Sequence, residues 1–293
     1  MKILKLYLSN IHPNIKGSLW MIGVVVSLCL LAIAAKELSD RHGPFEILTM
    51  RHALSLIFLL PFILKGGKIK TVKLQLQTLR NVSHFFATTG WVIAITMIPL
   101  AEVFALEFTT PLWVAILALI FLGEKINFSK IVSLILGICG IIIILRPGFN
   151  ELGLGTIIMI FSAIGFAITN TTTKALTRYD DLITVLFWMS VIQLPLSLIA
   201  SLFEINSILF EDIPWVILVG LCGIISHFSL TKAMQLADAS LVNPVDFLRL
   251  PLISLLGFYI YQEQIDFFVI IGAVLIFVGN YYAIWNESKK KNS

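Results

Sequence analysis

Long apolar segments separated by short polar links dominate this sequence and restrict its possible folds. A helix that crosses the hydrocarbon core of a bilayer needs about 20 mostly apolar residues. The spacing therefore predicts an all-α polytopic membrane protein with ten transmembrane helices. The segments are 17–36, 45–64, 77–98, 101–121, 129–146, 153–173, 182–203, 214–232, 240–261 and 267–285. The tightest link is Ile98-Pro99-Leu100, where a single broken helix would change the count.

Composition excludes the other broad classes of protein. Hydrophobic residues make up 58% of the 293 residues and charged residues only 13%, whereas soluble domains carry about 25% charged residues. A chain this apolar cannot hide its side chains in a core that is surrounded by water. A soluble enzyme, a disordered protein and a disulfide scaffold are therefore excluded.

The basic residues are distributed unevenly over the predicted links. With ten spans and a cytoplasmic N-terminus, sixteen of the 21 lysines and arginines, Arg80 among them, fall on the cytoplasmic side, three fall outside, and two lie within spans. Cytoplasmic links of membrane proteins carry such an excess of basic residues. We therefore expect a multi-pass protein of the cell (inner) membrane with both termini in the cytoplasm. The net charge of +4 then orients the protein and does not indicate nucleic-acid binding.

The two halves of the chain resemble each other when the sequence is shifted by 138 or 139 residues. Each half, 1–148 and 149–293, holds five predicted spans, so the second half enters the bilayer in the opposite orientation. Inverted repeats of this kind are typical of secondary transporters, which bind their substrate near the bilayer midplane between the repeats. Matching positions include Gly17 and Gly155, Lys36 and Lys174, Glu107 and Asp246, Phe108 and Phe247, and Gly140 and Gly279.

Several motifs within this repeat resemble a known family. They are Pro99-Leu-Ala-Glu-Val-Phe-Ala-Leu-Glu-Phe-Thr-Thr-Pro-Leu-Trp113, Leu122-Gly-Glu-Lys125 and Arg146-Pro-Gly148, echoed by Ala237-Asp-Ala-Ser240, Asn243-Pro244 and Glu263. With these motifs the chain resembles, over essentially its whole length, the ten-span EamA family of the drug/metabolite transporter superfamily. Its layout is also similar to the members regarded as S-adenosylmethionine uptake carriers. The resemblance implies a central cavity lined by the first, third, fourth, sixth, eighth and ninth spans.

Four ionisable residues lie deep within predicted spans: Arg51, Glu107, Asp246 and Arg249. Such residues are costly in a membrane, so they pair with one another or line a cavity. In one interpretation they are structural: Asp246 pairs with Arg249, three residues further along the same helix, and Arg51 pairs with Glu107. In the other, Arg249 or Arg51 binds a substrate carboxylate, while Glu107 or Asp246 binds a cation or a coupling proton. Glu107, which has apolar neighbours, is the candidate for proton coupling.

Five further residues complete the candidate substrate-binding set: His84, Trp91, Trp113, Asn170 and His227. The two histidines lie in corresponding spans, four residues out of register, and imidazole can relay protons near neutral pH. The indole faces of the tryptophans suit a cationic or ring-bearing ligand. Asn170 either contacts the substrate, caps its helix or bonds to a neighbouring helix. For the histidines, packing between helices is the structural alternative.

The sequence contains no glycine-rich nucleotide-binding loop and no His or Cys cluster that could hold a catalytic metal, so we expect no cofactor and no metal. We predict a secondary transporter, not an enzyme, that moves a small polar or amphipathic metabolite, such as an amino-acid derivative, by alternating access. The alternatives are an S-adenosylmethionine uptake or exchange carrier and an intramembrane lipid-modifying enzyme. The expected partners are a small-molecule substrate and the lipid bilayer, and a homodimer is left open.

Overall fold

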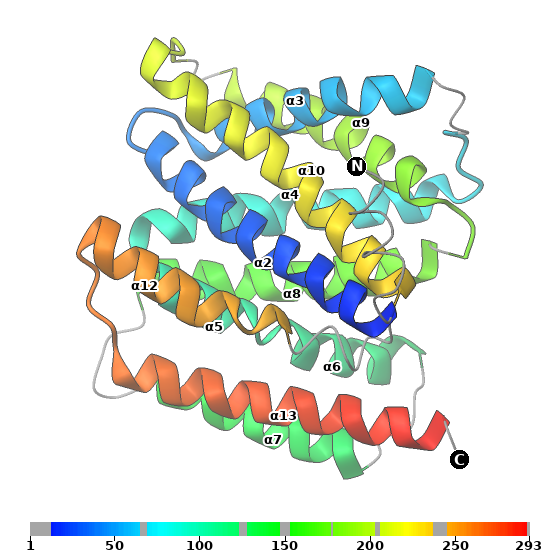
Figure 1. Ribbon diagram of the computed structural model, residues 1–293, viewed down its shortest axis with the longest axis vertical. Coiled ribbons are helices and arrows are strands. Elements are labelled where there is room, and N and C mark those ends of the chain that lie inside the picture. The colour runs from blue at the N-terminus through cyan, green and yellow to red at the C-terminus, as the bar shows by residue number, and fades with distance from the viewer. Residues whose placement is uncertain are drawn as a thin grey trace, which may run out of the picture.

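The computed structural model describes residues 13–64, 69–122, 128–146, 153–176, 178–202, 206–236 and 245–291. Within these ranges every regular element is a helix, and the helices lie side by side in one bundle (Figure 1). Their bounds are α2 (Pro13–Leu38), α3 (Pro44–Leu64), α4 (Leu74–Met97), α5 (Leu100–Glu107), α6 (Thr110–Leu122), α7 (Phe128–Leu145), α8 (Leu154–Leu176), α9 (Leu182–Ser201), the 3-10 helix η1 (Phe210–Asp212), α10 (Ile213–Leu236), α12 (Arg249–Tyr261) and α13 (Phe267–Lys291).

Five of these helices are long and apolar enough to cross a membrane, judged by length and composition: α2, α3, α8, α9, and α10 together with η1. Shorter apolar segments occur in α7, α12 and α13. The 24-residue α4 is also long enough, but its buried residues include the polar Gln77, Arg80, Asn81 and His84, while Leu79 and Phe86 are exposed. The chain is therefore a multi-pass membrane protein, while the count of ten spans stays a prediction.

The main helix contacts join the two predicted halves of the chain. Helix α2 packs on α10, α4 on α8, α3 on α9, and α7 on α13. A Cβ atom added at Gly140 or at Gly272 would lie 2.6 Å from the carbonyl oxygen of the other glycine, so α7 and α13 approach closely there. A Cβ at Gly279 would instead meet Ser133, near the start of α7. The two equivalent helices therefore run antiparallel, as inverted repeats require.

The link between α4 and α5 is a true break between two helices. Helix α4 ends at Met97, Ile98 has an extended backbone, and Pro99 is the N-cap of α5. Proline fits this place because its missing N–H group is not needed at a helix start. The predicted boundary between the third and fourth spans is thus confirmed.

Two predicted spans are not continuous helices, and on this point the sequence-based segments 101–121 and 240–261 were wrong. Helix α5 ends at Glu107, and α6 begins after a turn at Phe108–Thr109. A proline ring clashes with the carbonyl four residues before it, and Pro111 stands four residues after Glu107. In the second half, a turn at 247–248 precedes α12, and Pro251 follows it in the same way; residues 237–244 lie outside the described part. Discontinuous helices at corresponding places in two repeats are typical of transporter binding sites.

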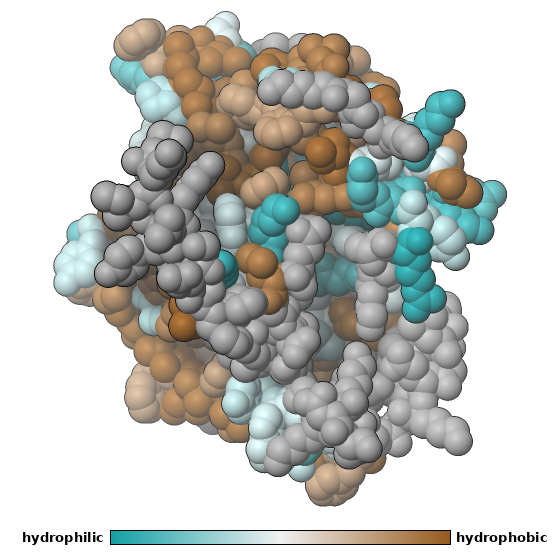
Figure 2. Space-filling view, turned by 45° about the vertical axis from the view of Figure 1, so that its right-hand side comes forward, coloured by the Kyte–Doolittle hydropathy of each residue, from teal (hydrophilic) through white to brown (hydrophobic). Residues whose placement is uncertain are grey.

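The buried core surrounds α5, where Leu100, Val103, Phe104, Ala105 and Leu106 are fully buried. Large apolar side chains also cover the outer faces of the bundle, and Figure 2 shows them in brown over much of the visible surface. Exposed apolar surface on this scale marks contact with a membrane. The outside of the bundle is therefore suited to lipid, and the polar residues within it need another explanation.

Candidate substrate-binding site

Arg249, the first residue of α12, lies in a buried group of charges that we call the Arg249 centre (Trp91, Glu107, Asp246 and Arg249). Its side chain donates from Nη1 to Oε1 of Glu107 at 2.8 Å and from Nη2 to Oδ2 of Asp246 at 3.0 Å. The indole Nε1 of Trp91 donates to the other Glu107 oxygen, Oε2, at 3.0 Å. Glu107 comes from the first half of the chain and Arg249 from the second, so this ion pair crosses between the halves.

The two helix breaks place these side chains. Glu107 is the last residue of α5, and Arg249 directly follows the turn at 247–248. At the same breaks, the rings of Phe108 and Phe247 stack with their centroids 4.5 Å apart. These two residues are equivalent in the repeat, so the pseudo-two-fold axis passes between their rings. The Arg249 guanidinium lies 4.9 Å from the ring centroids of Phe104 and Phe108, a distance at which cation–π attraction operates.

The Arg249 centre is not neutral when its three ionisable groups are charged. Two carboxylates face one guanidinium, which leaves one negative charge in surplus. Oδ1 of Asp246 and Nε of Arg249 are buried and have no hydrogen-bond partner. A carboxylate oxygen without a partner can accept a hydrogen bond from a cationic ligand, and the adjoining indole and phenyl rings attract the same kind of group.

A second polar group, which we call the basic cluster, consists of Arg51 and His52 of α3, Arg80 and His84 of α4, and His227 of α10. The rings of His84 and His227 lie 5.9 Å apart between their centroids. Both histidines lie within electrostatic range of Arg51 and Arg80. Both arginines are buried, with exposed fractions of 5% and 2%. The first half therefore supplies two buried positive charges, and His227 of the second half lies near them.

Neutral partners hold part of the basic cluster in place. Nδ1 of His84 lies 3.1 Å from Oε1 of Gln193 on α9, and Nε2 of Gln193 donates to Oδ1 of Asn81. Arg80 donates to Asn81 at 2.6 Å and to Oγ1 of Thr173 at 2.9 Å. In the described part of the chain, the partners of Arg80 are thus uncharged.

Helix α4 contributes to both groups. His84 and Trp91 are seven residues apart, which is about two helical turns, so they share a face at a separation of about 10 Å along the helix axis. The Arg249 centre and the basic cluster are therefore neighbours along one face of α4.

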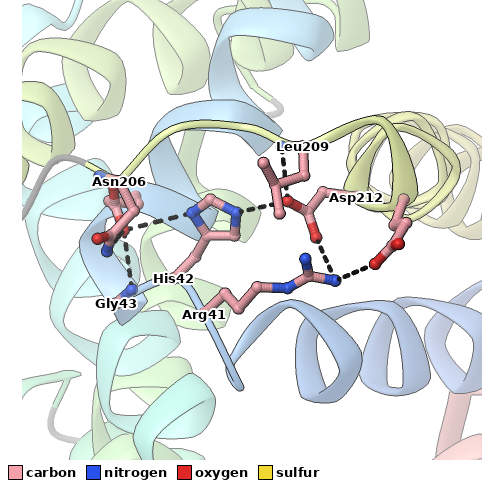
Figure 3. A network of polar contacts seen from close by, with 8 residues as sticks. Arg41, His42, Gly43, Asn206, Leu209 and Asp212 are labelled. Carbon is pink, nitrogen blue, oxygen red and sulfur yellow. Dashed lines mark hydrogen bonds and ion pairs between the residues drawn. The ribbon is translucent and has the colours of Figure 1, made fainter.

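A third polar network joins the turn between α2 and α3 to the segment that leads into α10 (Figure 3). The buried ring of His42 lies between two carboxylates, with Nδ1 3.4 Å from Glu46 and Nε2 3.3 Å from Asp212. Asp212 also pairs with Arg41 at 3.2 Å, and Glu46 accepts hydrogen bonds from Asn206. This network fastens α3 of the first half to α10 of the second.

Further ion pairs join the two halves at the same end of the bundle, on the left of Figure 1. Lys36 at the end of α2 pairs with Glu263 after α12, and Arg146 after α7 pairs with Asp266 before α13. Glu263 also accepts a hydrogen bond from the Leu100 backbone at 2.9 Å. In the ten-span topology all of these residues are predicted to lie outside the cell, so the two halves are cross-linked at the predicted outer end.

Comparison with known proteins identifies the family. The EamA-like transporter family matches this chain twice, over residues 15–146 and 153–285. The chain belongs to the EamA-like transporter family. The resemblance seen in the sequence motifs is thereby confirmed, and the two matches fall on the two halves whose helices pack against each other.

Curated EamA relatives align over nearly the whole chain. An S-adenosylmethionine uptake transporter of Rickettsia prowazekii is 28% identical over 95% of this chain and 96% of its own length. A riboflavin transporter of Rhizobium johnstonii is 25% identical over 94% of this chain and 93% of its own. One crystal structure shares the fold, with a TM-score of 0.64 and 14% sequence identity over 94% of this chain and 98% of the other. The names of the two curated relatives point to a membrane transporter.

Within this EamA fold, four predicted site residues meet in the Arg249 centre. The predicted pairing of Asp246 with Arg249 is present, but the predicted pairing of Arg51 with Glu107 is wrong, since Glu107 binds Arg249. Two arginines in different spans cannot be ranked from one sequence as partners of the same glutamate. Trp91 was expected near a cavity, and its bond to Glu107 is an addition from the structure.

The remaining predicted site residues lie either in the basic cluster or outside both groups. His84 and His227 meet in the basic cluster despite their different register. The Trp113 indole donates to Oγ1 of Thr109, within its own broken span, at 3.1 Å, and Asn170 is exposed on α8. The described contacts of these last two residues place neither in the two groups.

Sequence analysis missed two members of the basic cluster, Arg80 and His52. Arg80 was counted with the cytoplasmic charges because it lies three residues inside a predicted span, and its burial in α4 corrects that assignment. The signal that could have found it is the spacing of Gln77, Arg80, Asn81 and His84, which share one helix face. In the part of the chain that the structure describes, no group of three His, Cys, Asp or Glu residues could hold a metal ion.

Proposed function

We propose that this EamA protein is a secondary transporter that moves a small polar or amphipathic, amino-acid-derived metabolite across the cytoplasmic membrane by alternating access. The observation that carries the proposal is the Glu107–Arg249 ion pair, which joins two broken helices at equivalent places in the two halves. Charged groups of both repeats at a pair of helix breaks are what a substrate site between inverted repeats requires.

The Arg249 centre is the proposed site for the cationic part of the substrate. Its surplus carboxylate supplies the countercharge, and Trp91, Phe104 and Phe108 supply aromatic surface. The ion pairs at the predicted outer end, among them Arg41–Asp212 and Lys36–Glu263, hold that end closed. Movement of one half against the other would break these pairs and open the site to the outside. The state described here is then the one that is closed outward.

S-adenosylmethionine is the first substrate to test, because it combines a permanent cation with a zwitterionic amino-acid group. Four relatives at 28% identity bear the name of S-adenosylmethionine uptake transporter. Purified protein in proteoliposomes should accumulate radiolabelled S-adenosylmethionine, and unlabelled S-adenosylmethionine inside the vesicles should accelerate entry by exchange. Uptake of labelled riboflavin and not of S-adenosylmethionine would identify riboflavin as the substrate and would leave the proposed transport mechanism unchanged. Chemical conversion of a lipid without uptake of any solute would favour the intramembrane enzyme.

Glu107 is the proposed proton-coupling residue. Protonation of its carboxylate would neutralise the group that binds Arg249 and would weaken the pair between the halves. We expect Glu107→Gln to abolish accumulation driven by a pH gradient while exchange of labelled for unlabelled substrate continues. The matched control is Glu211→Gln, which alters a 78% exposed carboxylate that pairs with Arg41 at the edge of the third polar network. If Glu107→Gln retains full pH-driven accumulation, Glu107 does not carry the proton.

The predicted topology has its own test. Cysteines introduced at Asn150 and Ser288 lie on opposite sides of the membrane in the ten-span arrangement. A membrane-impermeant thiol reagent applied to intact cells should label the first and not the second. Protection of both positions until lysis would contradict ten spans with cytoplasmic termini.

A further inference from the structure

In the described part of the chain, no carboxylate pairs with either arginine of the basic cluster, Arg51 or Arg80. We propose that Arg51, with Arg80 and the histidines around it, forms a buried subsite for the carboxylate of the transported molecule. The proposal rests on the proposed transport function and specifies the substrate class as one that carries both a cation and a carboxylate. The Arg249 centre and the basic cluster would then bind opposite charges of one molecule.

Arg51 is the residue that most needs an anion. Its side chain is 5% exposed, and in the described part of the chain no hydrogen bond or ion pair involves it. Its buried Nε atom has no partner and faces Gly223 of α10, where an added Cβ would lie 2.9 Å away. A charged guanidinium in this position is costly unless an anion pairs with it. A ligand carboxylate would supply the missing pair with bidentate geometry.

Unused hydrogen-bonding groups accompany Arg51. Both ring nitrogens of His52 are buried without a partner, and so are the hydroxyl groups of Ser55 and Ser190. Ser55 lies one helical turn after Arg51 on the same face of α3, and α9, which carries Ser190, packs against α3. Buried polar groups in native proteins nearly always have partners. His52 and Ser55 follow Arg51 by one and four residues on α3, and these unpartnered groups with the unpaired arginine indicate a site for a polar ligand.

Among the described residues of the surrounding helices, no carboxylate binds either arginine. Arg80 binds Asn81, Thr173 and the sulfur of Met189, all of them neutral. The carboxylate joined to this network, Asp180, instead accepts hydrogen bonds from Gln77 at 2.7 Å and from Thr71 at 2.7 Å. The described side chains of α3, α4, α9 and α10 therefore leave the charges of Arg51 and Arg80 without a counter-ion, and an anion would reduce this excess positive charge.

Binding of matched ligands tests the subsite. Wild-type protein in detergent should bind S-adenosylmethionine at least about tenfold more tightly than decarboxylated S-adenosylmethionine, which keeps the sulfonium and loses the carboxylate. Arg51→Met should bind the two compounds with equal affinity. Arg51→Lys, which keeps the charge but not the planar fork, should retain part of the preference. Arg178→Met, which alters an exposed arginine, is the matched control and should behave as wild type. Equal affinities in the wild type, or an undiminished preference in Arg51→Met, would overturn the proposal.

Thermal unfolding without ligand gives a second readout. If Arg51 is unpaired until a ligand binds, Arg51→Met should melt at the same temperature as the wild type or higher, because an unpaired buried charge has been removed. A lower melting temperature, or failure to fold, would show that Arg51 has a structural partner and would contradict the subsite.

Failure of the substrate choice is distinguishable from failure of the subsite. If the wild type binds and transports neither compound, S-adenosylmethionine is not the substrate. The subsite is then tested with sodium acetate and inorganic phosphate at constant ionic strength. Either anion should raise the melting temperature of the wild type and not that of Arg51→Met. Equal responses of the two proteins to both anions would reject the subsite, whatever the transported molecule is.

Discussion

Two buried arginines in this protein are almost equally hidden from solvent but differ in what surrounds them. Arg249, with an exposed fraction of 4%, has two carboxylates as partners, and Arg51, at 5%, has none in the described part of the chain. The charge of Arg249 is therefore satisfied by the fold, whereas that of Arg51 is satisfied only if something binds. Burial of a charge does not by itself show whether an arginine has a counter-ion within the protein; its contacts do.

The largest expected loss of stability follows from replacing Arg249, the arginine whose charge is paired within the protein. In Arg249→Met, Glu107 and Asp246 lose their counter-ion, and removal of one partner from a buried ion pair costs about 3–5 kcal/mol. The free energy of unfolding, measured by denaturation with SDS in mixed micelles, should fall by that amount. Arg249→Lys should lose less, because it keeps the charge. Wild-type stability in Arg249→Met would place Arg249 in the same class as Arg51.

Glu107→Gln should produce the next largest loss. This substitution keeps the shape of the side chain and removes the charge that binds Arg249, along with part of the strength of the Trp91 bond. A hydrogen bond to a charged group contributes about 1.5–3 kcal/mol, and the unfolding free energy should fall within that range. Glu211→Gln alters an exposed side chain that pairs with Arg41, and it should leave the unfolding free energy unchanged. A similar loss in both variants would mean that the Glu107–Arg249 pair contributes no more to stability than an exposed ion pair.

Asp246→Asn should cost less than Glu107→Gln. Asp246 holds Arg249 through one oxygen, and its side chain is 26% exposed, against 18% for Glu107. Partial exposure weakens an ion pair, so we expect a loss of about 0.5–1 kcal/mol in the same SDS titration. If the loss equals that of Glu107→Gln, the two carboxylates share Arg249 equally.

The smallest expected effect lies in the basic cluster. Gln193→Leu removes the amide that bonds to His84 and Asn81, and hydrogen bonds between membrane helices contribute on average about 0.6 kcal/mol. The loss in unfolding free energy should be of that size, while the preference for a carboxylate-bearing ligand should decrease because His84 is no longer held. A loss above about 2 kcal/mol would show that the basic cluster contributes as much to stability as the Arg249 centre.

Sequence reasoning recovered much of this fold because hydropathy and repeat signals are local. Apolar segments of membrane-spanning length, the break at Pro99 and the match of Glu107 with Asp246 can all be read without coordinates. The two helix breaks were missed because each segment is apolar enough on average to be taken as one continuous span, although Pro111 and Pro251 mark the breaks. Those prolines were the available signal.

Partners across helices were harder to predict than positions along them. Glu107 could pair with either deep arginine as far as the sequence shows, and helix packing decides between Arg51 and Arg249. Arg80 looked like an interfacial charge, since a residue three positions inside a span can reach water or turn inward. The contacts between α4, α8 and α9 settle its direction, and a single sequence does not contain them.

The stacked rings of Phe108 and Phe247 mark an axis about which the two repeats would be interchangeable if their sequences were identical. An exactly symmetric carrier would have inward-facing and outward-facing states of equal free energy, since exchanging the conformations of its halves converts one state into the other. Arg249 breaks this degeneracy, because its counterpart in the first repeat is Thr110, which has no charge. The resting preference of the carrier for one side of the membrane is then set by such unmatched residues and not by the shared architecture.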